Sequence, residues 1–502
     1  MSGYTDAHGS LCSQALAGFF ARSKDVYQDN RSREILVSRA RYLNITSTIS
    51  RAIHDCLTRG VVGSGIRYEP TETSDFFDYY SDITKELKKA FKKCSYSKLF
   101  DSSHSLTFEQ LEQLVFYTMI VSGEAWLFRK PDSIEWKVKE PDYIKTPSYL
   151  CSDSLNTSFV KYGENYIYDG IEITESGLPV ACWYCIDPYS LDTNIKDNYT
   201  RIPFVDDEGV PLVIHVYIKE RPDQLRGLPL TAPVITQLWS TLAYSDSELQ
   251  MAILQCNQSL IITTNTNPTT NPFGMITQRE LNSPLIPDVE DTETKTESSK
   301  DFSIFPPMGS QYLDGLINRM NFISPGQSHH LAEGEDVKFL SPTAPSTGLA
   351  GFIDLQIRQI GSSLGIPEQV LSGKFDSNFS AVKGSCAAYN HTVKRYRKTF
   401  IESFLKPFFE VFSYFYIMQN GDGEDKAQAV EASKLLALES VWIPNDSPLT
   451  LDPTKEIDYF LKAVESGLIT RDEAAQALFG HLATGTPQTT NYQENKENID
   501  QT

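Results

Sequence analysis

A serine between two glycines is the first residue whose setting could carry chemistry. Gly361-Ser-Ser-Leu-Gly365 matches the Gly-x-Ser-x-Gly pattern of a nucleophile elbow, with Ser363 as the nucleophile. That motif needs a strand before it and a helix after it. Here an amphipathic helical pattern precedes the motif and Gly-Ile-Pro follows. We therefore predict a helix end and no catalytic residue, and we keep a serine hydrolase using Ser363 as an alternative.

Two cysteines and two histidines have the spacing of a possible redox or metal site. Cys182-Trp-Tyr-Cys185 stands in a strand pattern, where positions three apart face opposite sides, and no second ligand pair is nearby. The adjacent His329 and His330 lie in a Pro-Gly-rich stretch without matching ligands. Neither a Walker A motif nor a dinucleotide fingerprint is present. The sequence predicts no metal and no cofactor.

The stretch RPDQLRGLPLTAPVI, residues 221–235, crowds two arginines, three prolines and a glycine together. It contains no nucleophile, general base or metal ligand. Guanidinium groups are planar donors that suit carboxylates. We therefore interpret Arg221 and Arg226 as a brace that binds carboxylates on the same or a neighbouring chain.

The charge of the chain limits its partners. With 45 Lys and Arg against 65 Asp and Glu, the 502 residues carry a net charge of −20, which repels nucleic acid and anionic membranes on average. The lysines of 85–93 and the basic residues of 394–398 are typical of a solvated helix face and of basic stems that pack over aromatic rings. The most apolar run, 404–418, is interrupted by Lys406, Pro407 and Glu410, so we expect no membrane contact.

Helical patterns come first and strand patterns follow. Apolar spacing predicts helices over 31–58 and 74–94, and Thr107 with Gln110 predicts a capping box for a third helix that runs to about Met119. Short alternating segments between 123 and 218 predict antiparallel strands. This order favours an α+β fold.

Long helices dominate the second half of the chain. We expect helices over 231–264, 348–364 and 381–418, the last kinked by Pro407, and further helices over 428–438 and 454–480. A strand is expected near 336–342. The segment 265–325 and the C-terminal end are polar and lack a core-forming pattern.

Several landmarks together resemble the lambda-type portal proteins of tailed bacteriophages. The first is Arg-Pro-x-Gln-x-Arg-Gly-x-Pro at 221–229, which a long helical pattern follows. The others occur in the same order as in that family, at 51–66, Gly123-Glu124, 324–342, 360–385, 442–444 and 451–475. No single motif is decisive, but the ordered set, over about 31–480, is specific.

The resemblance implies a portal fold with wing, stem, clip and crown that assembles as a ring. By order along the chain it implies the following parts: an α+β wing at 31–230, a stem helix at 231–264, a clip-like protruding segment at 265–335, a strand and second stem helix at 336–364, a tunnel loop at 365–380, a long kinked wing helix at 381–427 and crown-like helices at 428–483. The lack of a core-forming pattern at the two ends predicts a flexible N-terminal arm at 1–30 and a disordered tail at 484–502. The loop residues that would face DNA are Lys374, Asp376, Asn378, Phe379 and Lys383.

The resemblance also implies the partners and the location. It implies a non-enzymatic homo-oligomeric ring, commonly of twelve subunits, at one capsid vertex of a virion assembled in the host cytoplasm. Double-stranded DNA would pass through it without sequence specificity, and the terminase large subunit, capsid or scaffold proteins and head-tail adaptor proteins would dock. The acidity favours passage of DNA over a salt-dependent grip on its phosphates. A non-conducting structural shell protein remains a further alternative.

Overall fold

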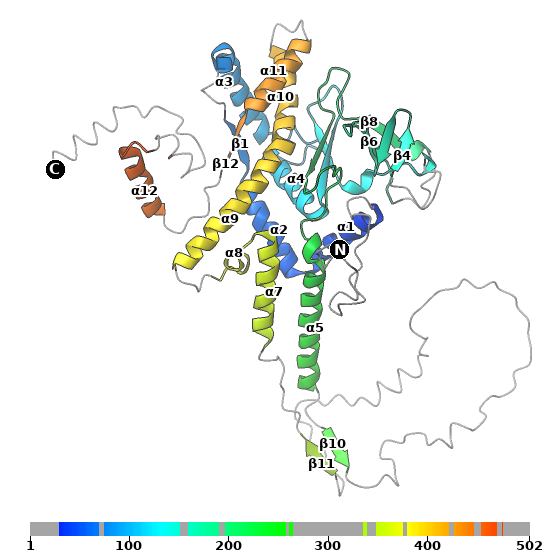
Figure 1. The fold of residues 1–502 in the computed structure, drawn as a ribbon, viewed down its shortest axis with the longest axis vertical. Coiled ribbons are helices and arrows are strands. Elements are labelled where there is room, and N and C mark those ends of the chain that lie inside the picture. Colours follow the sequence, from blue (N-terminus) through cyan, green and yellow to red (C-terminus); the bar gives the residue numbers. More distant parts are fainter. Residues whose placement is uncertain are drawn as a thin grey trace, which may run out of the picture. The chain divides into compact units, whose positions relative to one another are not determined.

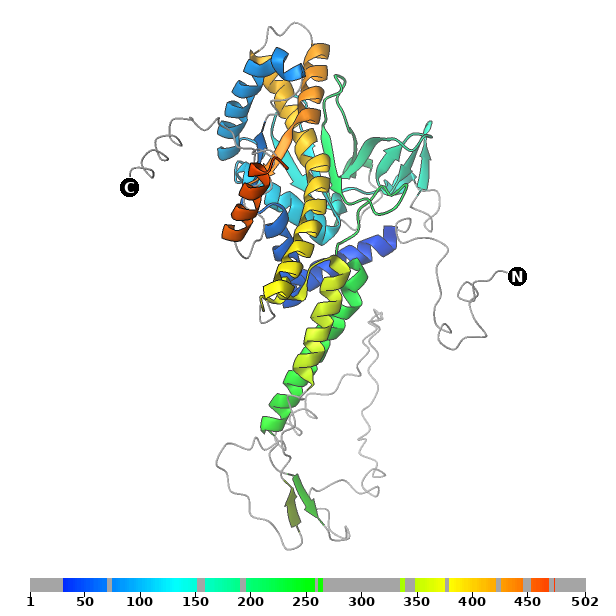
Figure 2. The same ribbon diagram turned by 60° about the vertical axis from the view of Figure 1, so that its left-hand side comes forward.

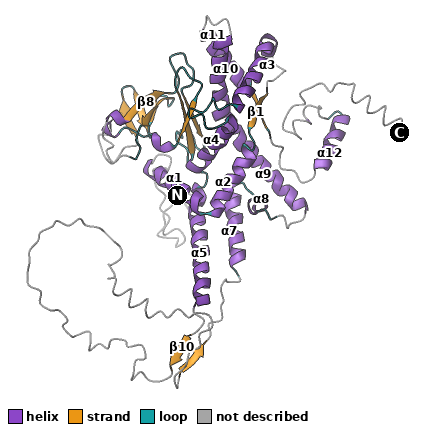
Figure 3. Ribbon diagram, turned by 180° about the vertical axis from the view of Figure 1, so that it is seen from behind, coloured by secondary structure: helices purple, strands orange, loops and turns teal. Residues whose placement is uncertain are grey.

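The computed structural model describes residues 30–69, 75–150, 159–189, 196–257, 261–264, 335–338, 348–374, 379–420, 426–445, 453–468 and 474. The chain divides into two compact units: Met1–Leu242 with Phe352–Thr502, and Ala243–Gly351. Most of the described strands lie between residues 124 and 217, and helices make up most of the remaining described elements, so the predicted α+β fold is confirmed. Figure 3 distinguishes the helices in purple from the strands in orange. None of the described helices combines the length and apolarity that a membrane crossing requires.

The N-terminal helices are α1 (Asn30–Thr46), α2 (Thr48–Val61), α3 (Asp75–Tyr96) and α4 (Phe108–Ser122). The single helix expected over 31–58 is wrong, because extended Ser47 separates α1 from α2 and its side chain accepts a hydrogen bond from the Ser50 N–H. The predicted capping box of Thr107 and Gln110 is confirmed at the start of α4. The sequence predicted the end of this helix near Met119, three residues before α4 ends at Ser122.

Two antiparallel sheets follow α4 in the described part of the chain. The three-stranded sheet has the order β3-β2-β9, and the five-stranded sheet has the order β4-β5-β6-β7-β8. The strands are β2 (Glu124–Arg129), β3 (Trp136–Lys139), β4 (Phe159–Tyr162), β5 (Asn165–Tyr168), β6 (Ile171–Ile173), β7 (Pro179–Cys185), β8 (Tyr199–Pro203) and β9 (Val213–Tyr217). The sequence patterns indicated all of these except β4.

The helix expected over 231–264 is shorter than predicted. A 3₁₀ turn at Ala232–Val234 leads into α5 (Ile235–Asn257), and Thr231 precedes that turn without a side-chain capping bond. Residues Ile261–Thr264 form strand β10, which pairs antiparallel with β11 (Glu335–Lys338). The β-branched run Ile-Ile-Thr-Thr explains the change from helix to strand.

The helix expected over 348–364 is confirmed as α7 (Leu349–Leu364). The predicted loop 365–380 contains a short helix, α8 (Glu368–Ser372). Residues 365–380 are therefore not loop throughout, because Pro367 starts the short helix α8 and the next helix, α9 (Phe379–Phe400), begins before residue 380.

A π-helical turn, Ile401–Leu405, joins α9 to α10 (Lys406–Asn420), and the two helices continue one another in Figure 1. The Lys406 N–H donates to the Ile401 carbonyl, five residues back. Pro407 has no N–H and its ring crowds the preceding turn, so the widened turn accommodates the irregularity that Pro407 predicts.

The last described elements are α11 (Lys426–Glu439), β12 (Val441–Pro444) and α12 (Pro453–Glu465). The helix expected over 428–438 is confirmed as α11, whereas the strand β12, which pairs antiparallel with β1 (Ile66–Glu69), was not expected within the crown-like helices assigned to 428–483. The helix expected over 454–480 stops at Glu465, where Gly467 takes a φ of +70° and the Leu468 N–H bonds back to Ala463.

Aromatic side chains fill the main core between α3, α4 and α10. In both Figure 1 and Figure 2, α10 lies between α3 on one side and the five-stranded sheet on the other. Phe91 packs against Phe108 and Phe412, with ring centroids 5.2 and 5.1 Å apart. A second cluster, centred on Trp126, Ile171 and Cys182, lies between the two sheets. These two cores hold the sheets and α4 in the positions that the ionic cluster below requires.

Candidate functional site

Gln224 fixes the shape of the loop that carries the arginines. Its side-chain oxygen accepts hydrogen bonds from the Glu220 and Arg221 N–H groups at 2.7 and 3.1 Å, and its amide donates to the Arg226 carbonyl at 2.9 Å. Asp223 adopts a positive φ of 59°. The loop is thus a folded turn that presents the Arg226 side chain to the protein interior.

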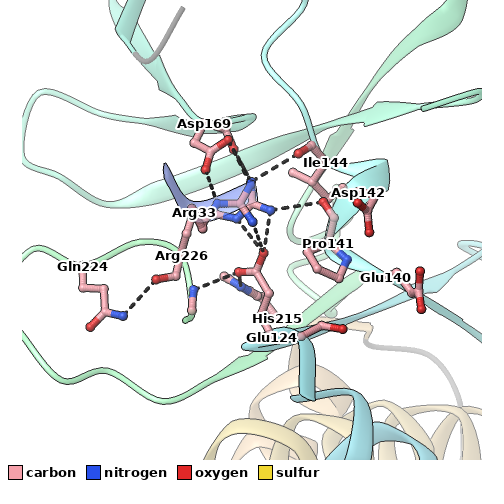
Figure 4. Close-up of polar contacts among 12 residues, drawn as sticks. Arg33, Glu124, Glu140, Pro141, Asp142, Ile144, Asp169, His215, Gln224 and Arg226 are labelled. Atoms are coloured by element: carbon pink, nitrogen blue, oxygen red, sulfur yellow. Dashed lines mark hydrogen bonds and ion pairs between the residues drawn. The ribbon is translucent and has the colours of Figure 1, made fainter. Parts of the chain in front are cut away.

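Arg226 is buried, with 1% of its surface exposed, and its guanidinium donates to several segments (Figure 4). Nε and Nη2 donate to Oε1 of Glu124 at 2.8 and 2.5 Å. The remaining donors bind the carbonyls of Pro141 and Ile144, both at 3.2 Å, and of Asp169. All five N–H groups of the planar guanidinium therefore have an acceptor.

Glu124, at the start of β2, is the central carboxylate of the cluster. Besides Arg226, it accepts hydrogen bonds from the Gly227 N–H at 3.0 Å and from His215 Nε2 at 2.8 Å. Burial would raise the pKa of Glu124, but the charges of Arg226 and Arg33 and the His215 hydrogen bond hold that pKa well below its ordinary value. Glu124 is therefore ionised although it is fully buried.

Arg33 of α1 and Asp169, between β5 and β6, complete the ionic cluster. Arg33 Nε lies 2.7 Å from Asp169 Oδ2, and Arg33 Nη1 lies 3.6 Å from Glu124 Oε1. Burial lowers the pKa of Arg33, but the charges of Asp169 and Glu124 raise it by more, so the pKa lies above its ordinary value. Two arginines thus balance two carboxylates, and the cluster has no net charge when His215 is neutral.

His215, on β9, completes the polar contacts around Glu124. Burial lowers the pKa of His215 despite its hydrogen bond to Glu124. Its ring stacks on Trp126, with centroids 3.8 Å apart. The neutral imidazole therefore orients Glu124 without adding charge.

Two glycines let the loop approach the end of α4. A Cβ on Gly227 would lie 2.0 Å from the Gly123 carbonyl oxygen, which no real contact permits. Gly123 itself ends α4 with a φ of +91°. The glycines of the two landmarks, Gly123-Glu124 and Arg226-Gly227, are needed because these backbone segments touch.

The arrangement suits structural bracing rather than catalysis. Each charged group of the cluster is bound by partners from distant parts of the chain, so none is poised as a nucleophile or a base. Arg221 lies exposed on the same loop and is not part of this cluster. Sequence reasoning singled out Arg226 and Glu124 but missed Arg33, Asp169 and His215, which no local pattern connects to them.

The predicted DNA-channel loop is described only in part. Lys374 is exposed, and its Nζ lies 3.3 Å from Asp354 Oδ1 on α7. Lys383 is exposed on α9, and Phe379 is the first residue of that helix. Asp376 and Asn378 lie outside the described residues. The structure therefore does not bring these five residues together in one described site.

The other candidate chemistries have structural explanations. Ser363 lies near the end of α7 and donates to the Ile360 carbonyl at 2.8 Å, so the predicted helix end is confirmed. Cys182 and Cys185 are buried on β7, as the strand pattern predicted, and burial raises the pKa of Cys182 to about 12. His329 and His330 lie outside the described residues. Among the described residues, no group of His, Cys, Asp or Glu side chains is arranged to hold a metal ion.

One basic residue of 394–398 has a defined structural contact. Arg397 donates to the carbonyls of Gly60 and Val61 at 2.6 and 2.9 Å and so caps the C-terminal end of α2.

The sequence matches one family model over most of its length. The model is that of phage portal proteins, lambda family, and the match covers residues 13–397. This range includes every residue of the ionic cluster and also α8. A search of curated proteins finds no significant match.

Solved structures resemble the chain at low sequence identity. The neck of an empty GTA particle computed with C6 symmetry is 11% identical, has a TM-score of 0.46 and covers 93% of this chain and 98% of its own. The virion of a native gene transfer agent (GTA) particle is 11% identical, with a TM-score of 0.46 and coverage of 92% and 96%. An HK97 family phage portal protein from Corynebacterium diphtheriae is 8% identical, with a TM-score of 0.31 and coverage of 70% and 85%. The family assignment rests on the sequence match.

Proposed function

The chain belongs to the lambda family of phage portal proteins, and on that premise we propose that it forms a ring through which double-stranded DNA enters and leaves a capsid. The ring has twelve subunits and sits at one vertex of the virion after assembly in the host cytoplasm. The family match over residues 13–397 is the observation that carries this proposal.

In this proposal the protein conducts DNA and provides a docking surface for other proteins, and it is not an enzyme. It binds the terminase large subunit during packaging, head-tail adaptor proteins afterwards, and capsid or scaffold proteins at the vertex. The net charge of −20 supports a channel in which DNA slides, since many cationic phosphate contacts would hold DNA in a salt-dependent grip.

Electron microscopy of the purified full-length protein tests the ring directly. We expect class averages with an axial hole and twelvefold symmetry. Monomers or dimers under all conditions would overturn the proposal, and closed cages without a hole would favour a non-conducting shell protein.

We place the DNA-facing loop at Lys374, Asp376, Asn378, Phe379 and Lys383. The exposure of Lys374 and Lys383 supports this placement, because cations that touch passing DNA must be accessible. The variants Lys374→Ala and Phe379→Ala should impair DNA packaging in an in vitro packaging assay while rings still form. Lys394→Ala, which removes an exposed lysine of the same helix as Lys383, is the matched control and should package normally. Loss of rings in the loop variants would instead assign the loop to a subunit interface.

A further inference from the structure

Helix α1 has an apolar face that remains exposed. Val37, Ala40 and Leu43 are buried on one side of the helix. Ile35, Tyr42 and Ile45 lie on the other side and are 44%, 55% and 84% exposed. Steps of seven and three residues place these three side chains along one stripe of a helix.

Trp239, near the start of α5, extends this stripe. Its ring centroid lies 6.3 Å from that of Tyr42, and the side chain is 52% exposed. We call Ile35, Tyr42, Ile45 and Trp239 the α1 seam. Exposed apolar side chains gathered along one stripe are typical of a surface that binds another segment.

We propose that residues 12–20 of the same chain bind the α1 seam. Within this segment, Cys12, Ala15, Leu16, Phe19 and Phe20 recur at the spacing i, i+3, i+4, i+7 and i+8, which gathers them on one face of a helix. The segment thus offers an apolar stripe that matches the exposed stripe of α1. The family match also begins at residue 13, so all but the first residue of the segment belongs to the matched region.

The connecting chain is long enough for this contact. Between Phe20 and Asn30, the first residue of α1, ten residue steps span at most about 33 Å when extended. From Asn30 to Ile45, the helix rises about 22 Å. Residues 12–20 can therefore reach the whole seam.

The tether also explains why the occupant belongs to the same chain. A short connection holds its segment near its site at an effective concentration in the millimolar range. A second copy that is free in solution has no such advantage, so residues 12–20 should cover the seam in dissociated subunits as well as in rings.

Tryptophan fluorescence can report on the α1 seam through Trp239. All five tryptophans lie within the described residues, and Trp126, Trp136, Trp183 and Trp442 are buried, whereas Trp239 is the exposed one. Acrylamide, which quenches accessible tryptophans, therefore reports on Trp239. In the full-length protein we expect little quenching, because residues 12–20 shield this ring. Trp239→Phe should remove the quenchable signal from any variant.

The double variant Phe19→Ser, Phe20→Ser tests the shield without deleting chain. We expect several-fold stronger quenching and a red-shifted emission, and the same result when residues 1–24 are removed. Val26→Ser with Tyr27→Ser, which changes two apolar residues of the connecting chain, is the matched control and should quench as the unchanged protein does. Strong quenching of the full-length protein would overturn the proposal.

Measurements on dissociated subunits and on rings separate the possible occupants. Shielding by residues 12–20 must be present in both forms. If the double variant stays shielded in rings but not in subunits, a neighbouring copy covers the seam and the proposal is wrong. If it stays shielded in both forms, another segment of the chain covers the seam, which also overturns the proposal.

Discussion

The ionic cluster around Arg226 and the ion pairs around α8 use the same residue types in opposite settings. In the cluster, Arg226 and Glu124 are 1% and 0% exposed, and their partners come from distant parts of the chain. Near α8, Arg358 and Glu368 are 66% and 20% exposed, with Nε 2.8 Å from Oε2. Lys374 and Asp354 in the same region are 60% and 40% exposed, 3.3 Å apart. Burial, not residue type, therefore decides whether a charge pair holds the fold together.

Arg226→Ala should give the largest effect. Removal of the guanidinium leaves Glu124 buried without its main cation, which costs about 3–5 kcal/mol of unfolding free energy for a buried pair. Denaturant unfolding measures this loss, and ring assembly should weaken with it. Arg221→Ala, on the exposed part of the same loop, is the control and should change the unfolding free energy much less. Equal effects of the two variants would contradict a brace centred on Arg226.

Gly227→Ala should come next. The added methyl group would lie 2.0 Å from the Gly123 carbonyl oxygen, so the loop must move away from α4, at a cost of about 1–3 kcal/mol. Gly384→Ala is the matched control on α9, where an added Cβ meets nothing within 4 Å. That variant should keep or raise the melting temperature. A stable Gly227→Ala protein would show that the close approach is dispensable.

The pH dependence of stability should also report on the cluster. Burial lowers the pKa of His215 below its ordinary value of 6.5, so the folded chain keeps this imidazole neutral while the unfolded chain gains a proton. The unfolding free energy therefore falls as the pH drops below 6.5, by at most about 1.4 kcal/mol per pH unit for one group. Buried His54, with a pKa of about 4, contributes in the same direction.

His215→Gln should reduce that slope, because the amide can still donate to Glu124 but does not titrate. Denaturant unfolding between pH 7 and pH 5 is the measurement. His391→Gln, at an exposed position of α9, is the matched control for the substitution itself. A slope that His215→Gln leaves intact would assign the pH dependence to other groups.

Lys374→Ala should have the smallest effect on stability. An exposed pair with Asp354 contributes at most about 1 kcal/mol, so the melting temperature should hardly change. High salt should weaken this pair but leave the buried cluster nearly unaffected. A large loss of stability would contradict the contrast between the two regions.

Local signals predicted most of the elements. The capping box at Thr107, the helical stripe around Leu87 and Phe91, and the alternating strands between 123 and 218 depend on neighbouring residues, and the structure contains them. Two of the errors involve tertiary pairing. The strand β12 pairs with β1, and β10 stands within the predicted stem helix, where its β-branched residues and its pairing with β11 both favour a strand.

The candidate site shows the same limit. The sequence singled out Arg226 for its crowded setting and Glu124 as a landmark, but no local pattern predicted that the two side chains form an ion pair. Arg33 and Asp169 are 136 positions apart, and only the tertiary packing brings their charges to 2.7 Å. Nor could the sequence distinguish buried Arg226 from exposed Arg221 on one loop.

The sequence by itself determined the α+β order of elements, the absence of a membrane-length apolar run and the family. These depend on residue types at short spacing, which the chain carries before it folds. Only the tertiary structure decided which charges lose water and meet partners, and which apolar face of α1 stays exposed. The energy of a charge or an apolar surface depends on its surroundings, and those surroundings come from segments that are remote in sequence.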